Sequence, residues 1–246
     1  MHTLALMQPY FLPYLGYWQL LAAADQFVLY DEVNYIKGGW INRNRILING
    51  QPSWLTVPLA HASPYQAIHA LQLDPSPRWR DKLLKTLQLT YGQSPHFDTV
   101  FPLLEHIVRY PTHSLADFLA HQLQQLATAM GIQTPQLRSS QAYLPRQPEQ
   151  SAQARVIDLC QQAHATHYLN LIGGQTLYSG ADFHAAGLAL RFIDLQPLPY
   201  PQKAASFVSH LSIVDSLMAV GFSGIQPYLA AYTLHPAAIH PTEHSA

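Results

Sequence analysis

The stretch that decides the fold runs from Thr3 to Asp31, TLALMQPYFLPYLGYWQLLAAADQFVLYD. Its first five residues form an apolar run that ends at Gln8-Pro9, which is typical of a buried strand stopped by a residue without a backbone N–H. Apolar residues then recur at helical spacing from Tyr14 to Ala24, and a second apolar run covers Phe27 to Tyr30. A strand, a helix and a strand in this order form a βαβ unit, so the two strands are expected to pair in parallel.

Strand and helix patterns alternate along the rest of the chain. Residues 45–48 and 53–57 are predicted strands, and Asn49-Gly50 between them is a strong hairpin signal. Helices are predicted over 78–91, 98–108, 114–130, 150–164 and 211–220, and further strands over 166–170 and 188–193, the last of the chain. We therefore predict an α/β fold with a mostly parallel sheet built from βαβ units, a helical layer or subdomain at about 75–135, and a small β-hairpin near 45–57.

The length and the C-terminal composition predict the domain organisation. Residues 1–234 are expected to form a single α/β domain that contains the helical insertion. Residues 235–246 are rich in His, Pro and Ala without a periodic pattern, so we predict a flexible tail there.

Charge and cysteine content limit the classes of partner. The chain has 13 Lys and Arg against 14 Asp and Glu, a net charge of −1, so no broad nucleic-acid surface is expected. The single cysteine, Cys160, cannot form an intramolecular disulfide, and the start of the chain lacks the basic segment of a signal peptide. No run of 18 apolar residues is present, so we expect a cytoplasmic protein without a membrane span.

The ends of the predicted strands mark a candidate site. In a doubly wound sheet, ligands bind beyond the carboxyl ends of the strands. The polar residues at these ends are Gln8, Asp31 and Asn170.

Residues 31–45 concentrate charge in a chain that has little of it. Arginine recognises carboxylate or phosphate through a planar pair of donors, and lysine adds a compact cation. We interpret Lys37, Arg43 and Arg45 as an anion pocket, with Asn42 and Asn44 as neutral donors. A solvated loop at the entrance of a hairpin is the alternative. In an extended segment the two arginines share one face and the two asparagines the other, so one face could be purely structural.

The loop from Gln8 to Tyr17 joins a strand to a helix N-terminus, where backbone N–H groups bind anions. Its plan is similar to that of the HIGH-motif nucleotidyltransferases and pantoate ligases. Those families carry a pair of histidines where this chain has Tyr14-Leu15-Gly16-Tyr17, and a phenol cannot supply an imidazolium charge. A rigid turn with core aromatics is the alternative for this loop.

Other motifs have simpler interpretations. The 14 histidines, His210 among them, lack the spacing of a metal site, so no metal is predicted and structural or surface roles are expected. Gly173-Gly174 lacks the rest of a phosphate-binding motif and is interpreted as a plain turn. Ser212 and Asp215 fit an ordinary helix cap, and Tyr200-Pro201-Gln202 precedes them.

Together these residues resemble the WbqC-like family over nearly the whole chain. The resemblance is carried by an N-terminal signature and by later blocks: Gln8-Pro9, Pro13, Gly16-Tyr17, Ala24-Asp25, Phe27-Val28, Asp31, Lys37, Trp40, Asn42 to Ile46, Leu55 to Pro58, Leu115 to Phe118, Tyr168, Gly173-Gly174, Tyr178, Tyr200 to Gln202 and Leu211 to Asp215. The resemblance implies a setting in O-antigen, other polysaccharide or specialised-metabolite gene clusters. The task it implies is attachment of an acyl or aminoacyl group, such as glycyl, to an amino sugar.

Our leading hypothesis is an enzyme that transfers an acyl or aminoacyl group to the amine of a small sugar. The expected partners are a small-molecule substrate, such as a nucleotide-linked sugar, and an acyl donor; no cofactor is named. Asp31 is assigned as general base and Lys37 as a second catalytic residue that holds an anion with Arg43 and Arg45. The other assigned substrate-binding residues are Gln8, Tyr14, Tyr17, Asn42 and Asn44.

Two other functions fit the same residues. A non-catalytic protein of such a pathway would bind the ligand without forming product. An ATP-dependent ligase distantly related to the HIGH-motif enzymes would place a nucleotide over Gly16.

Overall fold

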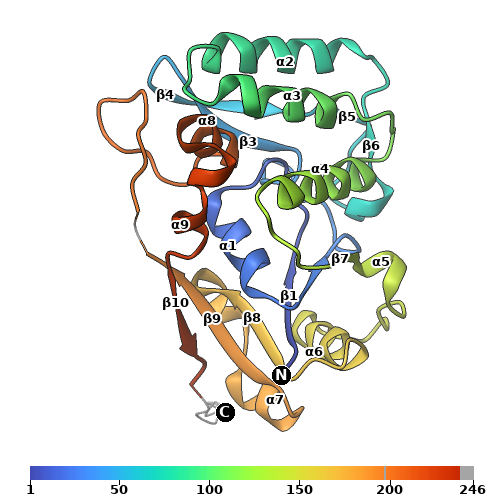
Figure 1. The fold of residues 1–246 in the computed structure, drawn as a ribbon. Coiled ribbons are helices and arrows are strands. Elements are labelled where there is room, and N and C mark those ends of the chain that lie inside the picture. The colour runs from blue at the N-terminus through green and yellow to red at the C-terminus, as the bar shows by residue number, and fades with distance from the viewer. Residues whose placement is uncertain (197, 239–246) are drawn as a thin grey trace.

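A computed structural model describes residues 1–196 and 198–238 and shows a central sheet covered by helices (Figure 1). The N-terminal stretch forms β1 (Thr3–Met7), α1 (Leu15–Ala23) and β2 (Gln26–Leu29). β1 pairs with β2 in parallel, with Leu4 opposite Gln26, so the predicted βαβ unit is confirmed.

The sheet has six strands in the order β10-β9-β8-β1-β2-β7. The other strands are β7 (Gln136–Arg138), β8 (His167–Leu171), β9 (Ala189–Leu195) and β10 (Tyr232–Pro236). All pairings are parallel except that of β10 with β9, which confirms the mostly parallel sheet. The chain leaves β1 on one side through β2 and β7 and then crosses to β8 on the other side. The topological switch point therefore lies between β1 and β8.

Two strands of this sheet were not predicted, and neither were the short strands 59–60 and 72–73 outside it. β7 has three residues and no apolar run, and β10 is largely exposed, so neither carries a local strand pattern. The expected boundary after residue 234 falls inside β10, because His235 pairs with Phe192 and Pro236 with Arg191. The remainder of the expected tail, 239–246, lies outside the described residues.

The predicted helical layer and hairpin are both present. α2 (Arg78–Tyr91), α3 (Phe97–Val108) and α4 (Leu115–Ala129) lie above the sheet in Figure 1. The hairpin consists of β3 (Arg43–Ile48) and β4 (Gln51–Thr56), and both turn residues adopt positive φ, 51° at Asn49 and 75° at Gly50. The remaining elements are β5 (Leu59–Ala60), β6 (Gln72–Leu73), α5 (Ser139–Ala142), α6 (Ala152–Gln162), α7 (Gly180–Ala185), α8 (Ile213–Gly224), α9 (Gln226–Leu229) and the 3-10 turns η1 (Ile68–Ala70) and η2 (Ile172–Leu177).

Both faces of the sheet are apolar. Ala5 of β1 belongs to the larger core, which extends to α2–α4 and α8. Leu4 and Leu6 belong to a second core with Cys160 of α6 and Tyr168 of β8. Alternate side chains of one strand thus enter two cores, which explains the continuous apolar run of β1.

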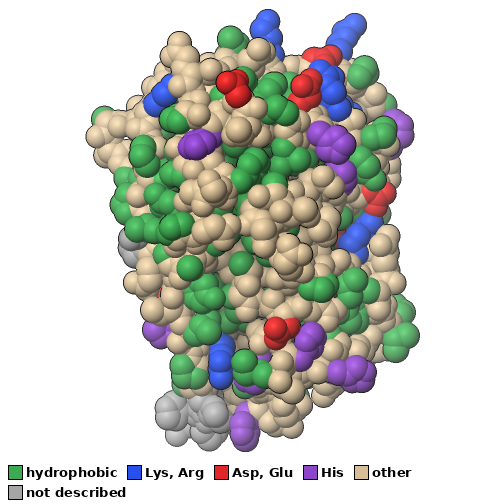
Figure 2. Space-filling model, in the orientation of Figure 1, with side chains coloured by type: hydrophobic (Ala, Val, Ile, Leu, Met, Phe, Trp, Pro, Cys, Tyr) green, Lys and Arg blue, Asp and Glu red, His purple; other side chains and the backbone are tan. Residues whose placement is uncertain are grey.

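The outer surface carries little charge of either sign. On the face in Figure 2, the charged side chains gather mainly at the top, over α2 and α3. There Arg109 pairs with Asp81 at 3.1 Å and with Glu105 at 2.9 Å. No helix in residues 1–196 or 198–238 is long and apolar enough to cross a bilayer.

The loop between β1 and α1 is held by buried polar side chains from distant elements. Asn44 donates through Nδ2 to the carbonyls of Phe11 and Leu12, at 3.1 and 2.8 Å. Gln122 of α4 accepts from the Leu12 N–H at 3.1 Å and donates to the Tyr10 carbonyl at 2.6 Å.

Two further side chains complete this arrangement. Ser212 donates through Oγ to the Leu12 carbonyl at 2.9 Å, and Trp18 donates through Nε1 to the Pro13 carbonyl at 2.9 Å. Leu12 adopts a φ of 42°, which costs energy for a residue with a side chain, so these bonds hold a strained backbone. We call Trp18, Asn44, Gln122 and Ser212 the loop clamp.

The loop clamp predicts the effect of Asn44→Ala. The substitution leaves the buried Phe11 carbonyl without its side-chain donor, so we expect the free energy of unfolding to fall by about 2 kcal/mol in urea denaturation. Asn34→Ala removes an exposed asparagine and should change stability by less than about 0.5 kcal/mol. Equal effects of the two substitutions would contradict the clamp.

Candidate functional site

A cleft of about 670 Å³ opens at the carboxyl ends of the parallel strands. It lies at the switch point, because Gln8 follows β1 and Ile172 to Gly174 follow β8. β2 contributes through Tyr30, which follows its last residue, and β9 through Ile193 and Leu195. Clefts of this size at this position of a doubly wound sheet are typical small-molecule sites.

The lining of the cleft is mostly apolar, and it contains no carboxylate, lysine or arginine among the described residues. Its polar side chains are amides, phenols and one imidazole: Gln8, Tyr10, Tyr14, Tyr30, Gln153, Asn170, Tyr178 and His210. Such a surface offers hydrogen bonds and aromatic faces without a fixed charge. It suits a neutral polar ligand better than a phosphate.

The phenols of the cleft stay protonated at neutral pH. Burial, together with Tyr10, raises the pKa of Tyr14 to about 12. Burial also raises the pKa of Tyr30 to about 12, with Glu32 acting in the same direction and Arg146 and Arg155 opposing it. These side chains can therefore act as neutral hydrogen-bond donors rather than as bases.

Two polar groups of the cleft lack partners. The buried hydroxyl of Tyr30 makes no hydrogen bond to any described residue. Gln8 uses its backbone carbonyl to accept from Tyr17 Oη at 3.2 Å, and its side-chain amide bonds to none of the described residues. Buried polar groups are normally paired, and the Tyr30 hydroxyl has no surface open to water, so a ligand atom reaches it only if the Tyr30 ring turns toward the cleft.

The end of β8 is organised by a hydrogen-bond network. Asn170 donates through Nδ2 to Tyr168 Oη at 3.2 Å, and Tyr168 Oη lies 3.3 Å from Tyr178 Oη. A Cβ atom at Gly174 would lie 3.2 Å from Asn170 Nδ2, tighter than ordinary contact, so glycine lets the turn approach this network closely. The Gly173-Gly174 turn, interpreted above as plain, thus forms one wall of the cleft.

The sequence analysis gave no site role to five polar residues of the cleft: Tyr10, Tyr30, Gln153, Tyr178 and His210. His210 is the imidazole among them. Its ring lies 5.3 Å from the ring of Tyr14, and its Nδ1 lies 2.9 Å from Ser209 Oγ. The backbone of His210 adopts a φ of 57°, an unfavourable conformation that is enriched at functional sites. The only local sequence signal is the position of His210 two residues before the helix cap Ser212. That position does not predict that the ring of His210 lies beside Tyr14 in the folded chain.

Three of the predicted binding residues are occupied by structural bonds. Tyr17 is fully buried and packs on Phe27, with ring centroids 5.3 Å apart. Asn42 accepts from Tyr35 Oη and donates to the Val57 carbonyl, both at 2.8 Å. Asn44 belongs to the loop clamp. None of the three lines the cleft, because each is consumed in holding the backbone around it.

The predicted cations lie on the outer face of the hairpin. Arg43 stacks on Trp54 at 3.9 Å and donates to the carbonyls of Gly38 and Gly39. Arg45 lies 5.6 Å from the ring of Trp40, on the strand face opposite Asn44. Lys37 is exposed and follows Ile36, which reaches the rim of the cleft. The structure therefore separates the three cations from Gln8 and Tyr14, which do line the cleft.

Comparison of the sequence with known proteins identifies its family. The profile of the WbqC-like protein family matches residues 8–226, from Gln8 in the cleft to the start of α9. The chain belongs to the WbqC-like protein family. It is 28% identical over 224 residues to Rv1507c, an uncharacterized protein of Mycobacterium tuberculosis, a match that covers 90% of this chain and 95% of the relative. No solved structure matches the chain.

In this WbqC-like protein Asp31 lies outside the cleft. Its Oδ2 accepts from Arg138 Nε at 2.6 Å and from Ser140 Oγ at 2.8 Å. Its Oδ1 accepts from Ser139 Oγ at 3.1 Å and from the Ser140 N–H at 3.0 Å. The side chain is 0% exposed, so four donors fill the carboxylate and leave no lone pair for a substrate proton. This differs from the expected general base: Asp31 fixes the start of α5.

No group of three metal-binding side chains occurs in the part of the chain that the structure describes. Cys160 is buried in α6, and burial raises the pKa of its thiol to about 12. Among the described side chains that line the cleft, proton transfer therefore falls to the imidazole of His210, because amides do not ionise and the phenols stay protonated.

The bonding of Asp31 predicts a structural phenotype for Asp31→Asn. The substitution leaves Arg138 without its buried partner, so we expect the free energy of unfolding to fall by about 3 kcal/mol in urea denaturation. Asp81→Asn removes one partner of an exposed ion pair and should cost less than about 1 kcal/mol. If Asp31→Asn keeps native stability and loses all turnover, Asp31 acts as a base and this assignment is wrong.

Proposed function

We propose that this protein binds the neutral ring of an amino sugar in the cleft and transfers an acyl or aminoacyl group to its amine. The observation that carries the proposal is the uncharged lining with the unpaired Tyr30 hydroxyl. Sugar hydroxyls exchange hydrogen bonds with amides and phenols, and sugar rings pack on aromatic faces. Membership of the WbqC-like family is consistent with this substrate class, because the resemblance described above implies a setting in O-antigen, other polysaccharide or specialised-metabolite gene clusters.

The cleft contains the groups that an acyl transfer needs. The amine nitrogen forms a bond to the acyl carbonyl carbon while His210 accepts the proton that the amine loses. The bond from that carbon to the leaving group then breaks, and the leaving group departs with the electron pair and takes a proton from His210. Tyr14 holds the imidazole, with the ring centroids 5.3 Å apart. The Gln8 amide and the Tyr30 hydroxyl are the donors for the charge on the carbonyl oxygen.

One cation lies next to the rim of the cleft. Lys37 is exposed and follows the rim residue Ile36, whereas Arg43 and Arg45 lie on the hairpin over Trp54 and Trp40. A nucleotide-linked sugar would place its neutral ring inside the cleft and a phosphate at Lys37. This assignment keeps the anion-binding role predicted for Lys37 and moves it to the rim.

Tyr30→Phe tests the proposed ligand contact. The substitution removes only a hydroxyl that has no protein partner, so stability should stay equal or rise slightly while affinity for the amino sugar falls about tenfold. Affinity is measured by calorimetry with glucosamine and its nucleotide-linked form, and stability by urea denaturation. Tyr65→Phe, at a tyrosine that is 88% exposed, is the matched control and should change neither. Unchanged affinity in Tyr30→Phe would remove the hydroxyl from the site.

His210→Ala tests the proton transfer. We expect turnover to fall by about 10²–10⁴-fold while amino-sugar affinity changes little, because a general base contributes mainly to the chemical step. Turnover is measured by mass spectrometry of the N-acylated sugar, with acyl-coenzyme A and aminoacyl donors offered in turn. His61→Ala, at an exposed histidine outside the cleft, is the control. Saturable binding with no product under any donor would favour the non-catalytic binding protein instead.

A further inference from the structure

A second cavity, of about 240 Å³, shares no lining residue with the cleft. It lies between β3, the end of α2, the segment 201–203 and α8, and its lining residues are Leu47, Thr90, Tyr91, Ser94, Pro95, Pro201, Gln202, Lys203, Asp215 and Ala219. At about 30 Å³ per water molecule, the space corresponds to roughly eight waters. It has room for an amino acid but not for a nucleotide.

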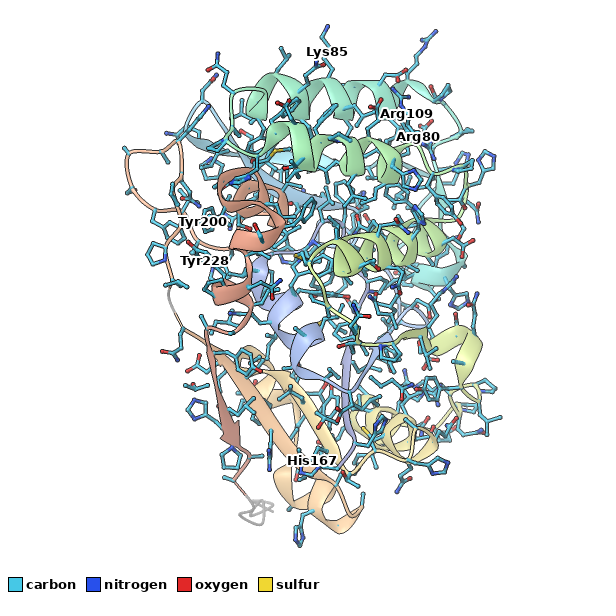
Figure 3. All side chains as sticks on the ribbon, in the orientation of Figure 1. Arg80, Lys85, Arg109, His167, Tyr200 and Tyr228 are labelled. Atoms are coloured by element: carbon cyan, nitrogen blue, oxygen red, sulfur yellow. The ribbon has the colours of Figure 1, made fainter. Side chains whose placement is uncertain are left out.

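Asp215 lines this cavity and is only 6% exposed. Tyr91 Oη donates to its Oδ1 at 2.9 Å, and Tyr200 Oη donates to its Oδ2 at 3.0 Å. Figure 3 shows Tyr200 beside α8, the helix that carries Asp215, with Tyr228 below it. The two C-terminal motifs, Tyr200 to Gln202 and Leu211 to Asp215, therefore meet at one carboxylate, which a helix-capping role does not require.

The carboxylate of Asp215 lacks a cation. Within residues 1–196 and 198–238 no lysine, arginine or histidine nitrogen lies within 4.0 Å of it. The protein pairs its other buried acids: Asp31 with Arg138 at 2.6 Å, and Glu32 with Arg155 at 2.7 Å. Burial raises the pKa of Asp215 even though hydrogen bonds from Tyr91, Tyr200 and Gln202 oppose the shift. A buried carboxylate is stable when a cation accompanies it, and here the adjoining space is a cavity.

Lys203 lines the same cavity and makes no ion pair with Asp215 within that distance. Asp215 and Lys203 thus border one small space without forming an ion pair with each other. A ligand that carries both charges would complete two ion pairs, its ammonium group at Asp215 and its anionic group at Lys203. Ser94 adds a hydroxyl to the lining, whereas Thr90 Oγ1 already donates to the Thr86 carbonyl at 2.7 Å and the Gln202 amide is bonded to the backbone of Val208.

We propose that this second cavity binds a small zwitterion of the amino-acid class, with its ammonium group on Asp215 and its carboxylate on Lys203. The site is independent of the amino-sugar cleft, since the two share no residue. It makes the protein responsive to a free amino acid whether or not the chemistry proposed for the cleft is correct.

The test begins with a thermal-shift screen of the intact protein against each of the standard amino acids, followed by calorimetry. L-Alanine, L-alaninamide and propionate then serve as matched probes, because alaninamide lacks the carboxylate charge and propionate lacks the ammonium group. We expect an amino acid to bind with at least about tenfold higher affinity than analogues that lack one of its charges. Failure of every amino acid to bind, or equal binding of propionate and alanine, would overturn the proposal.

Variants separate this site from a structural role. Asp215→Asn should lose at least about tenfold in affinity while its melting temperature without ligand stays equal or rises, because an uncompensated buried charge is removed. Lys203→Met should weaken alanine but not alaninamide, and Lys85→Met, at the exposed α2 lysine in Figure 3, should weaken neither. Tyr30→Phe should leave amino-acid affinity unchanged, so failure of the cleft and failure of this site are distinguishable. Native affinity in Asp215→Asn would contradict the assignment.

Discussion

The loop clamp is the constraint on which the rest of the structure depends. Residues 10–13 turn sharply after β1, and their carbonyls cannot all bond within the turn because Leu12 is held at a φ of 42°. Asn44, Gln122 and Ser212 reach this loop from the hairpin, the helical layer and the start of α8. One short loop thus joins the sheet to three segments that are far apart in the sequence. The same loop carries Tyr10 and Tyr14 into the cleft. The hydrogen bonds that hold the strained backbone of Leu12 therefore also position these two tyrosines.

The charged side chains around the site are neutralised or held in two different ways. Asp31 and Glu32, directly after β2, are sealed by Arg138 and Arg155, which leaves the cleft itself without fixed charge. Arg43 and Arg45 stay on the hairpin, over the rings of Trp54 and Trp40. Asp215 is the exception, because it is buried without a cation among the described residues and lines a cavity instead. The uncharged cleft and the small cavity beside the Asp215 carboxylate therefore fit ligands of different chemistry.

The parts of the fold that could be predicted are those with a strong local pattern. The apolar runs of β1 and β2 and the Asn49-Gly50 turn carry their own signals, and all three elements form as expected. β7 and β10 depend on the strands they pair with and have no such pattern. The candidate site shows the same division. Gln8 and Asn170 follow from the rule on strand ends, and both line the cleft.

The assignments of Asp31 and His210 needed the structure. Adjacent residues of an extended segment point in opposite directions, so Tyr30 faces the cleft while Asp31 faces α5. No local pattern tells which of two neighbouring polar residues enters a site. His210 reaches the cleft only through tertiary packing against Tyr14. The arginines of the cation cluster lie on the hairpin face that carries Trp54, and composition alone does not specify that position.

The most direct test of the account is a crystal structure with a bound N-acylated amino sugar. The account predicts the sugar ring between Gly174 and Tyr14, with a polar ligand atom within hydrogen-bond distance of Tyr30 Oη. A sugar bound on the Trp40 and Trp54 face of the hairpin, with none in the cleft, would contradict it.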